Sequence, residues 1–141
     1  MDAFVGFAAS PKPREGAKVQ SLNFEISSKH GIKNCLVIAT SQLGLESWLG
    51  KFEKFDFRQG AKLSVIRAEE KTGLSFAQIN IPRSVILVTE VFGQVEFSFK
   101  EMKDSVRVSI GFRKAVTDDE LDAWSSEVEV AKSVILGALC D

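Results

Sequence analysis

The stretch QVEFSFKEMKDSVRVSIGF, residues 94–112, carries the clearest structural signal in the chain. Apolar and polar side chains alternate along both halves, and the pair Lys103–Asp104 separates the two halves. This alternation is typical of β-strands with one buried face, so the stretch predicts a β-hairpin. The side chains expected on the buried face are Val95, Phe97, Phe99, Val106, Val108, Ile110 and Phe112. A shift of the pairing by one residue would turn all of them to the other face, so the register should be firmly set.

The segment after the hairpin, TDDELDAWSSEVEVAKSVILGALCD at residues 117–141, predicts a long amphipathic helix. Thr117 and Glu120 form a capping box, and the acidic pair Asp118–Asp119 suits the positive end of the helix dipole. The expected apolar stripe consists of Leu121, Trp124, Val128, Ala131, Ile135 and Ala138, widened by Val134 and Leu139. Such a stripe needs an apolar partner, and the phenylalanine-rich face of the hairpin is the expected one.

The N-terminal half adds one strand and two short helices. These elements are predicted over residues 21–27, 32–39 and 41–49. The strand prediction rests on the alternation of Leu22, Phe24 and Ile26 with polar residues. Ser41 is the expected N-cap of the second helix, and Gly50 is its expected stop.

Four further strands are predicted between the helices and the hairpin. They cover residues 51–57, 61–68, 74–81 and 84–92, with turns at 58–60, at 69–73 and at Pro82. The last of them is apolar on both faces, which is typical of a strand covered on two sides. It leaves room for self-association through the outer sheet face, centred on Ile86, Val88 and Phe92. The order strand, two helices, six strands and helix predicts an α+β fold with helices packed on one face of an antiparallel sheet.

Composition and charge indicate one ordinary globular domain. Apolar residues make up 45% and charged residues 26% of the 141-residue chain, within the usual range for such domains. Residues 1–16 contain SPKPREG, which predicts a flexible arm, and residues 17–141 are expected to form the single domain. The net charge of −1 gives no general attraction to nucleic acids or anionic membranes. No apolar run is long enough to span a bilayer, and we expect a cytoplasmic protein.

Few residues are arranged for chemistry. The one histidine, His30, is expected to be exposed, and one histidine with two distant cysteines does not supply a metal site. Cys35 and Cys140 lie in apolar helical patterns, which predicts buried thiols rather than a disulfide or a nucleophile. The carboxylate pairs Glu69–Glu70 and Asp118–Asp119 fall in a predicted turn and a predicted helix cap. We therefore expect no catalytic residue, no metal and no cofactor.

The element order over residues 17–140 resembles the START-related helix-grip (SRPBCC) superfamily. The stretch TSQLGLESWLGKFEKFDFRQGAKLSV, residues 40–65, resembles the signature region of the activator-of-heat-shock-protein-90-ATPase-homologue-like family. That region has a threonine, a short helix ending in a tryptophan, a glycine, a strand and an arginine-x-glycine turn. The matching residues are Thr40, Leu43, Trp48, Gly50, Asp56, Arg58 and Gly60. The resemblance implies a helix-grip fold, in which a curved seven-stranded antiparallel sheet (β-α-α-β6-α) surrounds a long C-terminal helix.

The first functional hypothesis is the binding of a small apolar, aromatic or lipid-like molecule. A curved sheet closed by a helix encloses a cavity where the facing side chains do not meet, and a solid core where they do; both alternatives stay open. The expected lining residues are Trp48, Leu63, Val65, Arg67, Phe76, Phe97, Phe99, Ile110, Trp124 and Val128. Trp48 is expected to end the second short helix and to close one end of the grip.

Arg67 raises a specific question within that lining. It shares a strand face with Leu63 and Val65. It either lies at the strand end and reaches water, or anchors an acidic or carbonyl-bearing ligand at an apolar pocket. Glu90 is either the partner of Arg67 or an outward residue at a strand end.

The resemblance implies two alternative functions. One is a co-chaperone or stress-response interaction module, since the named family includes activators of a heat-shock protein ATPase. The other is a cyclase-like or hydrolase-like enzyme that uses the same cavity.

Overall fold

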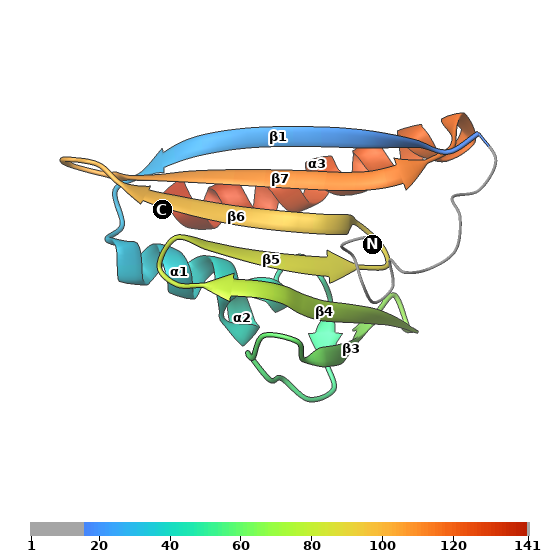
Figure 1. Ribbon diagram of the computed structural model, residues 1–141, viewed down its shortest axis with the longest axis horizontal. Coiled ribbons are helices and arrows are strands. Elements are labelled where there is room, and N and C mark those ends of the chain that lie inside the picture. The colour runs from blue at the N-terminus through green and yellow to red at the C-terminus, as the bar shows by residue number, and fades with distance from the viewer. Residues whose placement is uncertain (1–15, 141) are drawn as a thin grey trace.

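The computed structural model describes residues 16–140, which form a seven-stranded antiparallel sheet and three helices (Figure 1). The strands are β1 (Lys18–Ser28), β2 (Lys51–Phe52), β3 (Lys62–Arg67), β4 (Glu70–Asn80), β5 (Ser84–Thr89), β6 (Gly93–Glu101) and β7 (Val106–Val116). The helices are α1 (Ile32–Thr40), α2 (Gln42–Glu46) and α3 (Asp118–Cys140). The strand order is β1-β7-β6-β5-β4-β3-β2, so the predicted α+β helix-grip class is confirmed. The predicted arm at residues 1–16 lies outside the described residues, except for Gly16.

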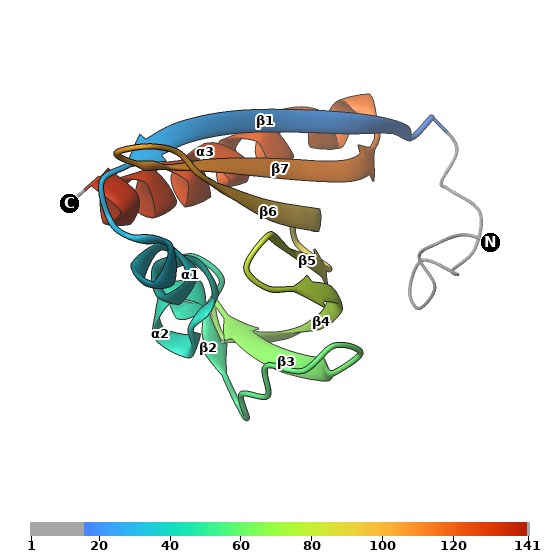
Figure 2. The ribbon, with the colours of Figure 1, turned by 60° about the vertical axis from the view of Figure 1, so that its left-hand side comes forward.

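The sheet is curved, and the three helices lie on its concave side (Figure 2). α3 packs against β1 and β7, whereas α1 contacts β6, β7 and α3. We term this side of the sheet the inner face and the opposite side the outer face. None of the helices in the described part of the chain is long and apolar enough to cross a membrane.

The hairpin β6–β7 has the predicted buried face, and its register pairs the buried side chains with one another. Val95 lies opposite Phe112, Phe97 opposite Ile110 and Phe99 opposite Val108. These side chains are all buried and point to the inner face, since strand side chains alternate between the two faces.

The buried stripe of α3 follows the prediction from Trp124 to Ile135, whereas Leu121 at its N-terminal end is only half-buried. It consists of Trp124, Val128, Ala131, Ile135 and Leu139. Ala138 is exposed, because the step of four residues from Ile135 to Leu139 keeps the stripe on one side of the helix. Cys140, in the next position, is also exposed, so the prediction of a buried thiol was wrong there and right for Cys35. At the other end the Thr117 amide donates to the Glu120 carboxylate at 2.9 Å, as a capping box requires.

Two predicted boundaries around β3 were wrong. The strand expected over residues 51–57 ends at Phe52, and the connection to β3 is irregular. The turn expected over residues 69–73 is shorter, because Ala68 and Glu69 have φ values of 50° and 68°. This left-handed backbone allows a two-residue hairpin turn, so β4 already begins at Glu70.

Phe92 was wrongly predicted to lie on the outer face. β5 ends at Thr89, and the Phe92 amide donates to the Thr89 hydroxyl at 2.8 Å. This turn directs the Phe92 ring into the core, where the residue has no exposed surface. The proposed centre of self-association therefore loses its aromatic member, while Ile86 and Val88 remain on the outer face opposite Glu96 and Gln94.

Candidate functional site

The predicted lining residues lie together on the concave side of the sheet. Eight are buried, and Leu63 and Arg67 are half-buried. The buried ones are Trp48, Val65, Phe76, Phe97, Phe99, Ile110, Trp124 and Val128. These eight belong to one apolar core, with Leu63 packed against it. Their lining of a ligand cavity stays a prediction.

Trp48 lies at the centre of an aromatic cluster between α2 and the sheet. Its ring meets those of Phe92, Phe97 and Phe112 edge-on, with centroid distances of 5.3, 6.2 and 5.9 Å. Trp124 Nε1 donates to the Phe92 carbonyl at 3.2 Å, so α3 is bonded to the same cluster. Edge-on geometry is favourable for aromatic pairs. Phe92 was missing from the predicted lining, because its alternation with the residues of β5 placed it outward.

Arg67 lies at the end of β3, as predicted, and its side chain is partly exposed, but its ionic partner is not Glu90. Its Nη1 donates to the carbonyl oxygens of Trp48 and Leu49 at 2.9 and 3.1 Å. Its Nη2 forms an ion pair with Glu127 of α3. The guanidinium carbon lies 5.2 Å from the centroid of the Phe92 ring, within the range of a cation–π contact.

Glu90 has a different role. It is exposed, and its carboxylate accepts a hydrogen bond from the Gly73 amide at 2.9 Å. This bond joins the β5–β6 turn to β4. Of the two alternatives for Glu90, the outward position near a strand end is therefore confirmed.

The connection between β2 and β3 places two phenylalanines against the inner side of β4. Phe55 contacts Phe52 and Phe76, with ring centroids 4.9 and 6.3 Å apart. Phe57 packs edge-on against Phe76 at 5.0 Å and remains 37% exposed. Phe55 belongs with Leu63 and Val65 of β3 to the apolar core, and the ring of Phe57 extends that core to the surface through its contact with Phe76.

Residues 54–57 of this connection, which we term the lid segment, are held differently from their neighbours. On either side the chain is bonded to the sheet, because the Glu53 amide donates to β3 and the Gly60 amide to β4. Within the described residues, the only hydrogen bonds of the lid segment are those between Asp56 and Arg58. In the described structure the lid segment is therefore packed against the sheet, chiefly through its two phenylalanine rings, without a hydrogen bond to it.

The residues that carry the family resemblance have structural roles. The Thr40 hydroxyl donates to the Leu36 carbonyl at 2.6 Å. Gly50 has a φ of 131°, and a Cβ there would overlap the carbonyl oxygen of Ile66. Arg58 pairs with Asp56 at 2.9 Å beside the turn at Gly60. The motif thus organises the α2–β2 turn and the lid segment.

Glu46 stabilises the α2–β2 turn electrostatically. Its carboxylate accepts a hydrogen bond from the Phe52 amide at 2.9 Å. This bond lowers the pKa of the Glu46 carboxyl, and partial burial opposes the effect. A hydrogen bond from Gln42 and the charge of Lys51 also lower the pKa.

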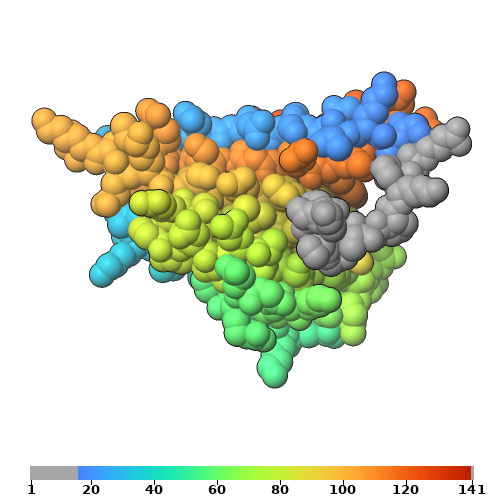
Figure 3. Space-filling model, in the orientation of Figure 1, coloured from blue at the N-terminus to red at the C-terminus, as the bar shows by residue number. Residues whose placement is uncertain are grey.

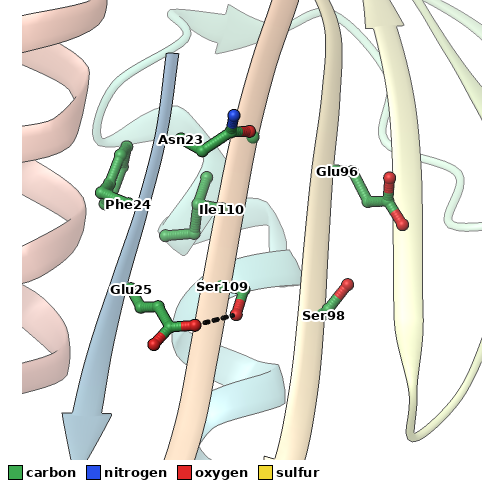
Figure 4. A pocket seen from close by; sticks show the side chains of 8 residues that line it. Asn23, Phe24, Glu25, Glu96, Ser98, Ser109 and Ile110 are labelled. Carbon is green, nitrogen blue, oxygen red and sulfur yellow. Dashed lines mark hydrogen bonds between the residues drawn. The ribbon is translucent and has the colours of Figure 1, made fainter. Parts of the chain in front are cut away.

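A second concave region lies on the outer face, which the helices leave uncovered (Figure 3). It has a volume of about 350 Å³. Its lining residues are Asn23, Phe24, Glu25, Glu96, Ser98, Ser109, Ile110 and Gly111 (Figure 4). Gly111 leaves space there, since a Cβ would overlap Asn23 Oδ1. Sequence patterns carry little signal for this groove, because its polar residues follow the ordinary outward alternation of a sheet.

His30 and the acidic residues do not assemble into a metal site. No group of three metal-ligating side chains occurs among residues 16–140. His30 is half-buried rather than exposed, and its Nε2 is buried without a hydrogen-bond partner in the described structure. The Cys35 thiol lies 3.7 Å from the His30 carbonyl, as expected for a packed structural thiol.

Comparisons with known proteins concern the fold. The sequence matches no protein-family profile and no curated protein. Solved structures with the same architecture include BH1534 of Bacillus halodurans (TM-score 0.70, 10% identity, 85% of this chain and 96% of that chain). They also include MLL2253 of Mesorhizobium loti (TM-score 0.69, 12% identity, 85% and 93%). A third is SA2116 of Staphylococcus aureus, a protein of unknown function (TM-score 0.67, 13% identity, 87% and 94%). At these identities the likeness shows the fold alone, and that fold is compatible with a helix-grip domain that binds a ligand in a cavity.

Proposed function

We propose that the protein binds a small apolar or aromatic molecule on the inner face of β3 and β4, beneath the lid segment. The proposal rests on one observation: the lid segment is packed on the sheet through its rings and not through hydrogen bonds. Phe55 and Phe57 cover Phe76 through ring contacts, while residues 54–57 make no hydrogen bond to the sheet in the described structure. A ligand can therefore replace these contacts without breaking a hydrogen bond between the lid segment and the sheet.

The energetics of such an exchange favour an apolar ligand. Moving Phe55 and Phe57 outward removes apolar contacts and exposes the ring of Phe76, which costs free energy in proportion to the apolar area exposed. A ligand of similar size restores that burial. A polar ligand would leave its own groups without partners beside Leu63 and Val65, which costs more. The site is thus expected to select for hydrophobicity and size.

Segments with few hydrogen bonds and partly exposed rings belong to the regions that open most readily in a folded protein. The part that would move ends at Glu53 on one side and at Gln59 on the other, because the Glu53 amide donates to β3 and the Gln59 side chain accepts from the Ile79 amide of β4. The proposed entrance is therefore short and local, and the seven-stranded sheet stays intact during ligand uptake.

Fluorescence titration with N-phenyl-1-naphthylamine, a neutral probe that brightens in apolar surroundings, tests this proposal. Saturable binding with one probe per chain, reversed by decan-1-ol, is expected. The Leu63→Gln variant should bind the probe at least about tenfold more weakly, because an unpaired amide in an apolar site costs about 1–3 kcal/mol. The matched control is Ser64→Gln, the next residue of β3, whose side chain points to the other face and whose change should leave affinity unaltered.

Absence of saturable binding by the wild-type protein would overturn the proposal. Equal affinity of the Leu63→Gln and Ser64→Gln variants, with both folded by circular dichroism, would place any bound probe elsewhere.

The alternative co-chaperone function rests on the resemblance of residues 40–65 to the ATPase-activator family, and the alternative cyclase or hydrolase function rests on the resemblance of the element order to the superfamily. Membership of that family remains a proposal supported by this motif. Among residues 16–140, no contact or cluster of side chains adds support to the co-chaperone role or to the cyclase or hydrolase role.

A further inference from the structure

We propose that the ligand is an amphipathic carboxylic acid, and that its carboxylate binds Arg67 in place of Glu127. This inference rests on the proposed function and specifies the chemical class of the ligand. It starts from an asymmetry between the two partners of one ion pair. The Arg67 side chain is 24% exposed, whereas that of Glu127 is 49% exposed.

The position of Arg67 is fixed by neutral acceptors. The carbonyl oxygens of Trp48 and Leu49 hold one of its terminal nitrogens, and the ring of Phe92 faces its guanidinium carbon. These groups orient the cation but do not neutralise its charge. A guanidinium that is largely withdrawn from water therefore needs an anionic partner nearby.

Glu127 supplies that anion in the present structure, and it is the exchangeable member of the pair. Half of its side chain is already in water, so its carboxylate is readily solvated when it leaves Arg67. Ion pairs with such an exposed partner contribute little to stability. Glu70 lies opposite Arg67 in the β3–β4 hairpin, yet no ion pair joins the two in the described structure.

A carboxylate is the group that fits the vacated position best. The planar guanidinium presents parallel donors that match the two oxygens of a carboxylate, and such bonds are stronger than those to neutral acceptors. An alcohol or an ester can accept a hydrogen bond there but leaves the cation unneutralised.

We place the apolar part of the ligand along the inner face of β3, where it would displace side chains that pack over Val65. Leu63, Val65 and Arg67 occupy alternate positions of β3 and therefore point to the same face. Arg67 lies four residue steps along the strand from Leu63, a distance of roughly 13 Å. On the side of Leu63 away from Arg67, the Phe76 amide of β4 donates to the Ala61 carbonyl, and the Phe76 ring contacts both rings of the lid segment. A head group at Arg67 would thus direct an apolar tail along β3 toward Phe57.

Isothermal titration calorimetry with decanoic acid and decan-1-ol at neutral pH tests this inference. The two probes share an alkyl chain and differ in the head group. We expect the wild-type protein to bind decanoate about tenfold more tightly than decan-1-ol, the effect of one hydrogen bond to a charged group. Arg67→Met should abolish the difference while retaining the affinity for decan-1-ol.

Glu127→Gln provides a second test that leaves Arg67 in place. Removal of the competing carboxylate should tighten decanoate binding several-fold and leave decan-1-ol binding unchanged. Glu129→Gln is the matched control on the same helix, because Glu129 pairs with Lys132 instead. It should change neither affinity.

The outcomes separate this inference from the function on which it rests. If neither probe binds, the proposed function fails. If both bind the wild-type protein equally, or if Glu127→Gln does not tighten decanoate binding, the anchor role of Arg67 is overturned while apolar binding stands. Should Arg67→Met fail to fold, the Glu127→Gln comparison still decides.

Discussion

Gly93 begins β6 with a φ of 78°, a left-handed conformation that side-chain-bearing residues rarely adopt. A Cβ at this position would overlap the carbonyl oxygen of Arg113 and come within 2.7 Å of the Lys114 Cβ. Both atoms belong to β7, whose position is fixed by pairing on both sides. Neither can move aside without disturbing the sheet.

Gly93→Ala should therefore lower the free energy of unfolding by about 3 kcal/mol, the sum of conformational strain and overlap. Gly60→Ala is the matched control, because Gly60 has a φ of 86° but an added methyl group there would meet no atom within 4 Å beyond its chain neighbours. It should cost only about 1 kcal/mol. Urea denaturation measures the free energy of unfolding of both variants. An equal loss of stability in the two variants would contradict the account of Gly93.

Glu46 gives stability a specific pH dependence. Its folded-state pKa lies below the ordinary value of 4.5, chiefly because its carboxylate accepts the Phe52 amide. The stabilisation is therefore present above pH 4.5 and is lost as the pH falls through the folded-state pKa.

Glu46→Gln should cost about 1 kcal/mol at neutral pH, because a neutral acceptor replaces a charged one. The difference between wild type and variant should shrink as the pH falls below about 4.5. Thermal unfolding of both proteins at a series of pH values around 4.5 measures this difference in stability. A constant difference at every pH would show that the carboxylate charge contributes nothing.

At the scale of elements, the lid segment differs from the strands around it. Each strand is held by a ladder of backbone bonds, whereas residues 54–57 depend on the rings of Phe55 and Phe57. Phe57 is also the more exposed of the two rings. Local opening should therefore begin there.

Phe57→Ala should speed the association of N-phenyl-1-naphthylamine several-fold in stopped-flow fluorescence, because one of the two covering rings is removed. Global stability should fall by no more than about 1–2 kcal/mol, less than for a fully buried phenylalanine. Leu43→Ala, at a residue 77% exposed on α2, is the control and should leave the rate unchanged. An unchanged rate for Phe57→Ala would exclude the lid segment as the entrance.

At the scale of the whole molecule, periodic sequence patterns predicted most of the architecture. The alternation in β6 and β7 predicted their inner faces, and the spacing in α3 predicted Trp124, Val128 and Ile135 as core residues. When one face of a strand or helix is buried along its length, apolar residues recur at a fixed spacing, so these elements can be predicted from the sequence.

The parts that sequence did not predict depend on non-periodic geometry. The alternation of Phe55 and Phe57 with polar residues suggested a strand, but their partner is a ring of β4 instead of a neighbouring strand. The Arg67–Glu127 pair joins residues sixty positions apart, and no local pattern specifies it. Phe92 turns inward because of a hydrogen bond to Thr89, which alternation does not encode.

Nuclear Overhauser effects between bound decan-1-ol and the aromatic protons of the protein test the central claim most directly. Decan-1-ol lacks a carboxylate, so the result does not depend on Arg67. We predict cross-peaks from the alkyl chain to Phe55, Phe57 and Phe76, with shifts confined to β3, β4 and the lid segment. Cross-peaks to none of these rings, with shifts instead around Ser98 and Ser109 of the outer groove, would contradict it.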